Sequence, residues 1–224
     1  MGTYLFCCPS PLAPACPTPY HGDMIHPRST LPKEPLHTGI LTSLKGQLLV
    51  ATADLNGSVF ERAVIYVVSH DTNGAMGVVV NKPIPKITFA DVVRGMNSDD
   101  MLHEGIGITH PGWHVARQLL IMKGGPVDGN RGVVLHSGEY KLPGTVEVNS
   151  EFGLTARAEL VTYIAKGQGP RKLNFCLGYA GWGPGQLDDE MHGQGWLVAP
   201  ADRTVVFDTP VDERYTAATR KLGL

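Results

Sequence analysis

Three successive carboxylates, Asp188, Asp189 and Glu190, follow a glycine-rich segment of the chain. Paired acids could bind a divalent cation or exchange a proton with a substrate. Adjacent positions on a helix point about 100° apart, so only one or two of the three can face a single pocket. Acidic residues in the first turn of a helix also stabilise the helix dipole without any chemistry. The pattern leaves both interpretations open.

Four histidines could also do chemistry. His136 stands at the end of an apolar run, where an imidazole could act as an acid or a base, although such a histidine is also typical of a structural hydrogen-bonded group. His103, His110 and His114 cluster along the sequence. The last two have i, i+4 spacing, but no helix is predicted there to align them as zinc ligands. We therefore assign no metal site and no cofactor.

Glycines alternate with aromatic residues between residues 177 and 186. This pattern predicts a loop in which the backbone passes tightly between the rings of Tyr179 and Trp182. As a functional element, the loop would point free N–H groups at a small ligand or an anion. As a structural element, it would fix a strand-to-helix connection. No P-loop, dinucleotide fingerprint or serine-nucleophile elbow is present.

Short strands separated by turns must position these groups, because 25 of the 27 glycines lie after residue 38 and glycine favours turns. Runs of β-branched residues predict strands at 47–52, 63–70, 77–81, 119–122, 132–136, 145–148, 173–177, 196–199 and 204–207. Helical spacing predicts helices at 88–96, 160–165, 185–191 and 211–222. Thr88 with Asp91 and Thr209 with Asp212 would cap the first and last of these helices. Residues 97–117 predict a loop.

The turn signal at residues 71–74 joins two of these strands into a hairpin, so part of the sheet is antiparallel. Strands also outnumber helices. The sequence therefore predicts a single compact α/β domain of the α+β type at residues 39–224. Its sheet is expected to be mixed, partly antiparallel or barrel-like, with a few short helices at its flanks.

Residues 1–38 differ in composition from the rest, since they hold 8 of the 17 prolines and 3 of the 4 cysteines. Proline fixes φ and lacks an N–H donor, so this density predicts a disordered tail. Met24 is an alternative start of the chain. Only Cys176 falls in the predicted domain, which implies no disulfide framework and fits a reducing cytoplasm.

Composition and charge argue against two kinds of partner. No run of 18 apolar residues is present, so no membrane-spanning helix and no membrane partner are expected. The net charge is −2, and the 17 lysines and arginines after residue 38 are scattered. Specific DNA binding needs clustered basic residues, and no helix-turn-helix pattern is visible. We therefore expect no direct specific binding to DNA.

Four sequence blocks in this order resemble the YqgE/AlgH family of bacterial proteins: residues 60–66, 74–83, 124–127 with 135–136, and 177–190. The likeness runs from about Gly39 to the C-terminus. It implies a compact cytoplasmic α/β protein, described in the family as a transcriptional regulator of alginate production, without a settled biochemical activity. His136 matches the family's Leu-His pair and Glu190 its motif acid, which makes Glu190 the better functional candidate of the three acids.

We therefore expect a non-catalytic, cytoplasmic regulator that acts indirectly by binding an unknown protein partner or a small ligand. The candidate ligand-binding residues are Asn81, Gly124, Gly125, Gly178, Tyr179, Gly181, Trp182, Gln186 and Glu190. The alternative is a hydrolase acting on a phosphate-bearing or nucleic-acid-related substrate, with His136 and Glu190 as acid–base groups. Convergence of these two with Asn81 and Gln186 in one pocket would favour the enzyme, and separate hydrogen bonds in the core would disfavour it.

Overall fold

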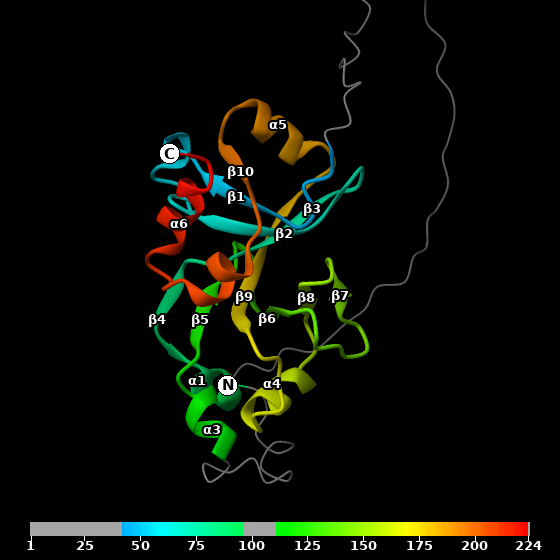
Figure 1. Ribbon diagram of the computed structural model, residues 1–224, viewed down its shortest axis with the longest axis vertical. Helices are drawn as coiled ribbons and strands as arrows, with labels where there is room; N and C mark the ends of the chain where they lie inside the picture. The colour runs from blue at the N-terminus through cyan, green and yellow to red at the C-terminus, as the bar shows by residue number, and fades with distance from the viewer. Residues whose placement is uncertain (1–41, 96–110, 224) are drawn as a thin grey trace, which may run out of the picture. The chain divides into compact units, whose positions relative to one another are not determined.

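The structure, a computed structural model, describes residues 42–95 and 111–223 (Figure 1). The predicted tail at residues 1–38 lies outside these ranges, so its predicted disorder and the predicted domain boundary stay predictions. Two of the three clustered histidines, His103 and His110, also lie outside them.

Ten strands and seven helical segments make up the described part of the chain. The strands are β1 (Gln47–Ala51), β2 (Val64–Asp71), β3 (Gly74–Val79), β4 (Pro83–Thr88), β5 (Leu120–Lys123), β6 (Val127–Ser137), β7 (Val146–Glu147), β8 (Phe152–Thr155), β9 (Leu173–Trp182) and β10 (Trp196–Pro200). The helices are α1 (Phe89–Gly95), α3 (Pro111–Ala116), α4 (Glu159–Ala165), α5 (Gln186–His192) and α6 (Arg214–Arg220), with a 3₁₀ turn η1 (Ala53–Leu55) and a π-helical segment η2 (Thr204–Asp208).

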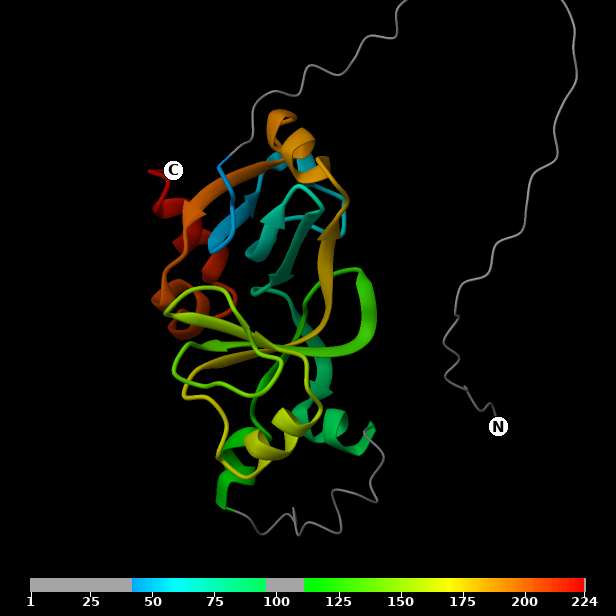
Figure 2. The same ribbon diagram turned by 90° about the vertical axis from the view of Figure 1, so that its right-hand side faces the viewer.

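Strand β9 holds the sheet together because it changes partners along its length. Its first part, residues 173–177, lies between antiparallel β6 and parallel β5, and residues 180–182 pair antiparallel with β3. The strand order is β10-β1-β2-β3-β9-β6-β8-β7, with β4 attached to β5. The result is a curled, mixed and mostly antiparallel sheet flanked by short helices (Figure 2). This confirms the predicted fold class.

Successive side chains of a strand point to opposite sides of the sheet. In β1 and β2, the side chains on both sides are buried. One face enters the interior of the curled sheet and carries Leu48, Val50, Val64, Tyr66 and Val68. The other face carries Leu49, Ala51, Ile65 and Val67. This double burial explains why both strands read as continuous apolar runs.

Helices cover the sheet at three places. Segments η2 and α6 contribute Val205, Val206 and Ala218 to the interior of the curl. Helix α5 covers the opposite face of β1–β3 through Leu187. Helices α1, α3 and α4 lie together over the β5–β6–β9 face, at the other end of the molecule from α5 (Figures 1 and 2). None of the helices in the described ranges is long and apolar enough to cross a membrane.

Two local sequence signals hold in the structure. The hairpin between β2 and β3 turns at residues 71–74, where the Asn73 N–H donates to Asp71 Oδ1 at 2.7 Å. At the start of α1, the Asp91 carboxylate accepts from the Thr88 N–H at 2.9 Å, and the Asp91 N–H donates to Thr88 Oγ1 at 3.3 Å. These reciprocal bonds are the predicted capping box.

Two predicted elements are wrong. The glycine–aromatic segment 178–182 continues strand β9 instead of forming a loop, because β3 offers it a ladder partner. The predicted strand at 204–207 is the helical segment η2. Val205 and Val206 are consecutive and both face the interior core, whereas in a strand one of them would face away.

The loops and the last helix also differ from expectation. Residues 111–116 of the predicted loop form α3, where Trp113 lies 6.2 Å from the Phe89 ring. Strands β4 and β8 were not predicted. Helix α6 begins at Arg214 without the expected cap, and the Thr209 hydroxyl donates to the Thr204 carbonyl instead. Tertiary contacts set this start, because the buried Arg214 guanidinium donates to the Thr209 and Val80 carbonyls.

Candidate functional site

Three of the predicted site glycines lie where β9 changes partners. Gly124 and Gly125 form the turn between β5 and β6, and Gly178 lies against them in β9. A Cβ atom on Gly178, where φ is +73°, would lie 2.7 Å from the Val127 carbonyl oxygen. One on Gly125 would lie 2.1 Å from the carbonyl carbon of Tyr179. Close backbone approach therefore explains these glycines without a ligand.

The backbone groups of this crossing bond within the fold. The Gly124 N–H donates to the Leu177 carbonyl and the Gly124 carbonyl accepts from the Val79 N–H, both at 2.8 Å. Further along, the Gly183 N–H donates to Gln186 Oε1 at 3.0 Å. Gly181 is exposed, and a Cβ atom there would meet only side-chain carbons, at 3.5 Å or more. The described bonds favour the structural interpretation of the glycine segment over an anion cradle.

The Glu190 carboxylate joins α5 to two strands. Its Oε2 accepts from the indole N–H groups of Trp182 in β9 and Trp196 in β10, each at 2.9 Å. Its Oε1 accepts from Gln186 Nε2 at 3.0 Å. Both indoles are buried, so these charge-assisted bonds satisfy donors that water does not easily reach. We call this arrangement the Trp182–Glu190–Trp196 clamp.

The two aromatic rings of the glycine segment lie on opposite faces of β9. Trp182 is buried beneath α5, where its ring stacks on Phe60 with the centroids 6.5 Å apart. Tyr179 is half-buried and packs against the interior core. Both rings are at least partly buried, as the sequence indicated, but they do not enclose one loop between them.

His136 is a fully buried group of the core. Nδ1 lies 3.0 Å from the Ser137 carbonyl oxygen and Nε2 lies 2.9 Å from Thr155 Oγ1, which in turn bonds to Thr145 Oγ1 at 2.7 Å. A carbonyl only accepts, so Nδ1 carries the proton and Nε2 accepts from the threonine hydroxyl. Burial lowers the pKa of His136, which keeps the imidazole neutral. The ring is therefore built into the structure.

Asn81 is also engaged in structural bonds. Its Oδ1 accepts from the Val64 N–H and its Nδ2 donates to the Arg62 carbonyl, both at 2.8 Å, so the amide holds the start of β2. The structure thus brings Gln186 and Glu190 together but gives His136 and Asn81 separate hydrogen-bond networks. This arrangement does not support His136 and Glu190 as one acid–base pair.

The three successive acids face different neighbours. Glu190 belongs to the clamp and Asp189 is exposed. Asp188 Oδ1 lies 3.5 Å from Nε2 of His70, a largely buried histidine that sequence reasoning missed. His70 Nδ1 accepts from the Leu44 N–H at 3.1 Å, so both ring nitrogens have structural neighbours. Among the described residues no group of three or more His, Cys, Asp or Glu side chains could hold a metal ion.

A pocket of about 180 Å³ opens between α1, α4 and the face of β6, β8 and β9. Its apolar lining consists mainly of Val92, Val134, Val161, Phe175 and Leu177. Its other lining residues include Arg131, from the bulged part of β6, and Arg157, which precedes α4. The lining residues come from these five elements and from the segment between β8 and α4, so the pocket exists only in the folded chain.

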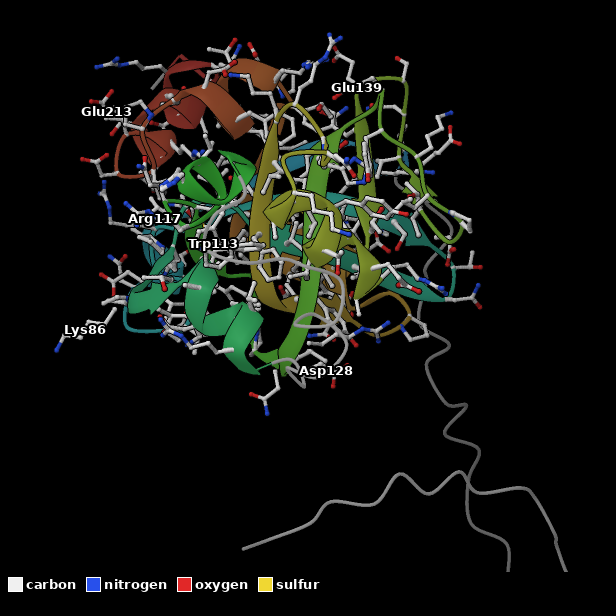
Figure 3. All side chains as sticks on the ribbon, turned by 90° about the horizontal axis from the view of Figure 1, so that it is seen from below. Lys86, Trp113, Arg117, Asp128, Glu139 and Glu213 are labelled. Atoms are coloured by element: carbon white, nitrogen blue, oxygen red, sulfur yellow. The ribbon has the colours of Figure 1, made fainter. Side chains whose placement is uncertain are left out.

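Both arginines of the pocket have exposed acidic neighbours. Arg131 Nη1 lies 4.0 Å from Asp128 Oδ2, and Figure 3 labels Asp128, which lies near the start of β6. Arg157 Nη2 donates to Glu159 Oε1 at 2.9 Å. The backbone N–H of Glu159 and the Arg157 guanidinium hold the pKa of the Glu159 carboxyl below its usual value. Neither acid lines the pocket.

Comparison with known proteins identifies the family. The family model described as AlgH-like matches residues 48–224. A UPF0301 protein of Afipia carboxidovorans is 40% identical over 195 residues, which cover 87% of this chain and 90% of that protein. A UPF0301 protein of Rhodospirillum rubrum is also 40% identical, over 84% of this chain and 90% of that protein.

The chain belongs to the AlgH-like family.

Solved structures agree with this assignment. The solution structure of the AlgH protein from Pseudomonas aeruginosa is 34% identical, with a TM-score of 0.69, and covers 82% of this chain and 90% of that chain. A crystal structure of a Corynebacterium diphtheriae protein, 18% identical with a TM-score of 0.56, covers 79% and 85% and shares the fold. The resemblance seen in the sequence is therefore confirmed for the family, while the AlgH-like relatives' names state no activity.

In this AlgH-like protein, the residues of the sequence motifs and the pocket lie in different parts of the fold. The candidate residues of the glycine segment belong to the β9 crossing and the clamp, whereas none of the nine candidates lines the pocket. Sequence reasoning missed Arg131 and Arg157 because they are single charges that lie 26 positions apart and belong to no motif. Val134 and Phe175 fall within predicted strands, but a strand pattern alone does not indicate that the two side chains border one pocket.

Proposed function

We propose that this AlgH-like protein is a non-catalytic, cytoplasmic regulatory protein that acts by binding a small ligand in the pocket between α1, α4 and the β6–β9 face. Of the two alternatives, a binding protein and a hydrolase, we favour the binding protein. In a regulator of this kind, ligand binding in the pocket would control binding to a protein partner. The protein would therefore act on transcription indirectly.

The proposal rests on the difference between the residues with catalytic potential and the pocket lining. The polar groups with catalytic potential, His136 and Glu190, hold structural hydrogen bonds in different parts of the fold. The pocket, by comparison, has an apolar lining that is open to solvent and carries no histidine, cysteine or carboxylate. Concave apolar sites with a few polar groups are typical of ligand binding. Thr155 is the one hydroxyl side chain among these lining residues, and it is fully buried and bonded to His136 and Thr145, so the lining favours binding over hydrolysis.

The regulatory and cytoplasmic parts of the proposal have separate support. The regulatory role follows the family resemblance. The single cysteine of the predicted domain, Cys176, is buried, and burial raises the pKa of its thiol to about 12, as suits an inert core residue. A net charge of −2 with scattered basic residues supports an indirect route to transcription rather than direct DNA binding.

Methyl NMR with a neutral apolar probe, benzyl alcohol, tests the proposal. We expect saturable shifts of the Val92, Val134 and Leu177 methyl signals. The Val161→Phe variant, which fills the pocket, should lose these shifts. The same substitution at the exposed Val146 of β7, Val146→Phe, should keep them. The proposal fails if no methyl signal saturates, or if signals throughout the protein move alike in all three proteins.

A further inference from the structure

We infer that the pocket takes a small carboxylate whose apolar body is about the size of one aromatic ring, and this inference rests on the ligand-binding function proposed above. The carboxylate would lie at Arg131 and Arg157, and the apolar body would lie against the valine and phenylalanine side chains of the lining. Size, charge and the scarcity of other polar groups each support this class of ligand.

Pocket volume sets the size of the ligand. The pocket measures about 180 Å³, and an engineered protein cavity of about 150 Å³ lined by apolar side chains binds benzene. Val134 of β6, Phe175 of β9 and Val161 of α4 are nearly fully buried residues of one core cluster, so this part of the lining is a firm apolar surface. A single ring or a short branched chain fits such a space.

The charge of the lining sets the charge of the ligand. The described residues that line the pocket include two arginines and no carboxylate. The two arginines come from different parts of the fold, so two cationic residues line one apolar space. A guanidinium presents its N–H donors in a planar fork that matches a carboxylate. An apolar molecule with one carboxylate therefore complements both parts of the pocket.

The existing ion pairs of the two arginines leave room for this contact. The Arg131–Asp128 pair is 4.0 Å long, and more than half of each side chain is exposed. The Arg157–Glu159 pair is shorter, at 2.9 Å, but is equally exposed. Exposed ion pairs of this kind contribute little to stability. A ligand carboxylate can therefore join or replace either acid with little loss.

Few other polar groups are present to recognise a sugar or a phosphate ester. Thr155 lines the pocket, but its hydroxyl already bonds to His136 and Thr145. Asn130 is the one side-chain amide among the lining residues. A ligand with many hydroxyl groups would leave some of them without partners against the apolar surface, which is unfavourable. The pocket thus favours one anionic group over several neutral polar ones.

A matched series of three probes tests the inference: benzoate, benzyl alcohol and benzylamine, titrated by methyl NMR at neutral pH. They share one ring and differ in charge. We expect benzoate to bind about tenfold tighter than benzyl alcohol, which is a factor that one charge-assisted hydrogen bond supplies, and benzylamine to bind weakest. The double variant Arg131→Gln/Arg157→Gln should lose the preference for benzoate. Arg220→Gln, an exposed arginine of α6 outside the pocket, is the control.

The outcomes separate this inference from the proposed function. Equal binding of the three probes, or an unchanged benzoate preference in the double variant, would overturn the carboxylate inference and leave the binding pocket standing. Failure of all three probes would overturn both. The variant Arg131→Lys/Arg157→Lys keeps both charges, so we expect it to retain part of the preference. Loss of binding there, equal to the glutamine variant, would argue against a charge effect.

Discussion

Removal of the Glu190 carboxylate is the most direct test of the clamp. In Glu190→Ala, the indole N–H groups of Trp182 and Trp196 lose their acceptor, although the two residues are only 6% and 2% exposed. A buried donor without a partner costs about 1–3 kcal/mol. Glu190 itself is only half-buried, so water can reach part of the vacated site. We therefore expect the free energy of unfolding to fall by about 2–4 kcal/mol for the two donors together.

Urea unfolding followed by tryptophan fluorescence measures this loss, because two of the three tryptophans of the chain form the clamp. Glu190→Gln retains one acceptor oxygen, so it should lose only about 1–2 kcal/mol. Asp189→Ala is the matched control, since it removes an exposed acid from the same helix and should cost less than about 1 kcal/mol.

Two results would refute the reasoning about the clamp. The first is a Glu190→Ala protein that unfolds at the same midpoint as Asp189→Ala. The second is a Glu190→Gln protein that is as unstable as Glu190→Ala, since this would mean that the acceptor oxygen has no role. An unchanged slope of the unfolding transition is needed for the comparison.

Three further predictions concern the crossing, the buried histidine and DNA. Gly178→Ala should destabilise the protein by more than about 2 kcal/mol in urea unfolding, because the new Cβ atom would lie 2.7 Å from the Val127 carbonyl oxygen. The control Gly185→Ala, at a similar φ of +72° but in open space, should cost about 1 kcal/mol. Equal losses in the two variants would contradict the steric argument. The pKa of His136 is lowered in the folded state, so below its unfolded pKa of about 6.5 the unfolded chain binds more protons and stability falls as the pH drops. In His136→Phe, the free energy of unfolding should fall less steeply between pH 6.5 and 5.5. An identical slope in the two proteins would show that His136 does not contribute. A fluorescence titration against genomic DNA fragments at about 150 mM salt with competitor should detect no specific complex; a submicromolar, competitor-resistant complex would contradict the indirect route.

Local patterns in the sequence were sufficient for much of the fold. The continuous apolar runs of β1 and β2, the turn at residues 71–74 and the capping box of Thr88 and Asp91 depend on neighbours within a few positions, and all of them hold. The four motif blocks also identified the family. These features could be predicted because strand alternation, turn conformation and helix capping are short-range properties of the chain.

Tertiary structure alone decided the rest. Residues 178–182 became a strand because β3 and the Gly124–Gly125 turn lie beside them, and Val205–Val206 became helical because both side chains face one core. Glu190 is a candidate ligand-binding or acid–base residue in the sequence, and in the fold it bonds to two indoles, one from β9 and one from β10. The pocket has no sequence signature, since its arginines and apolar residues meet only when α1, β6, α4 and β9 pack together. Such contacts join residues far apart in the chain, and no local spacing encodes them.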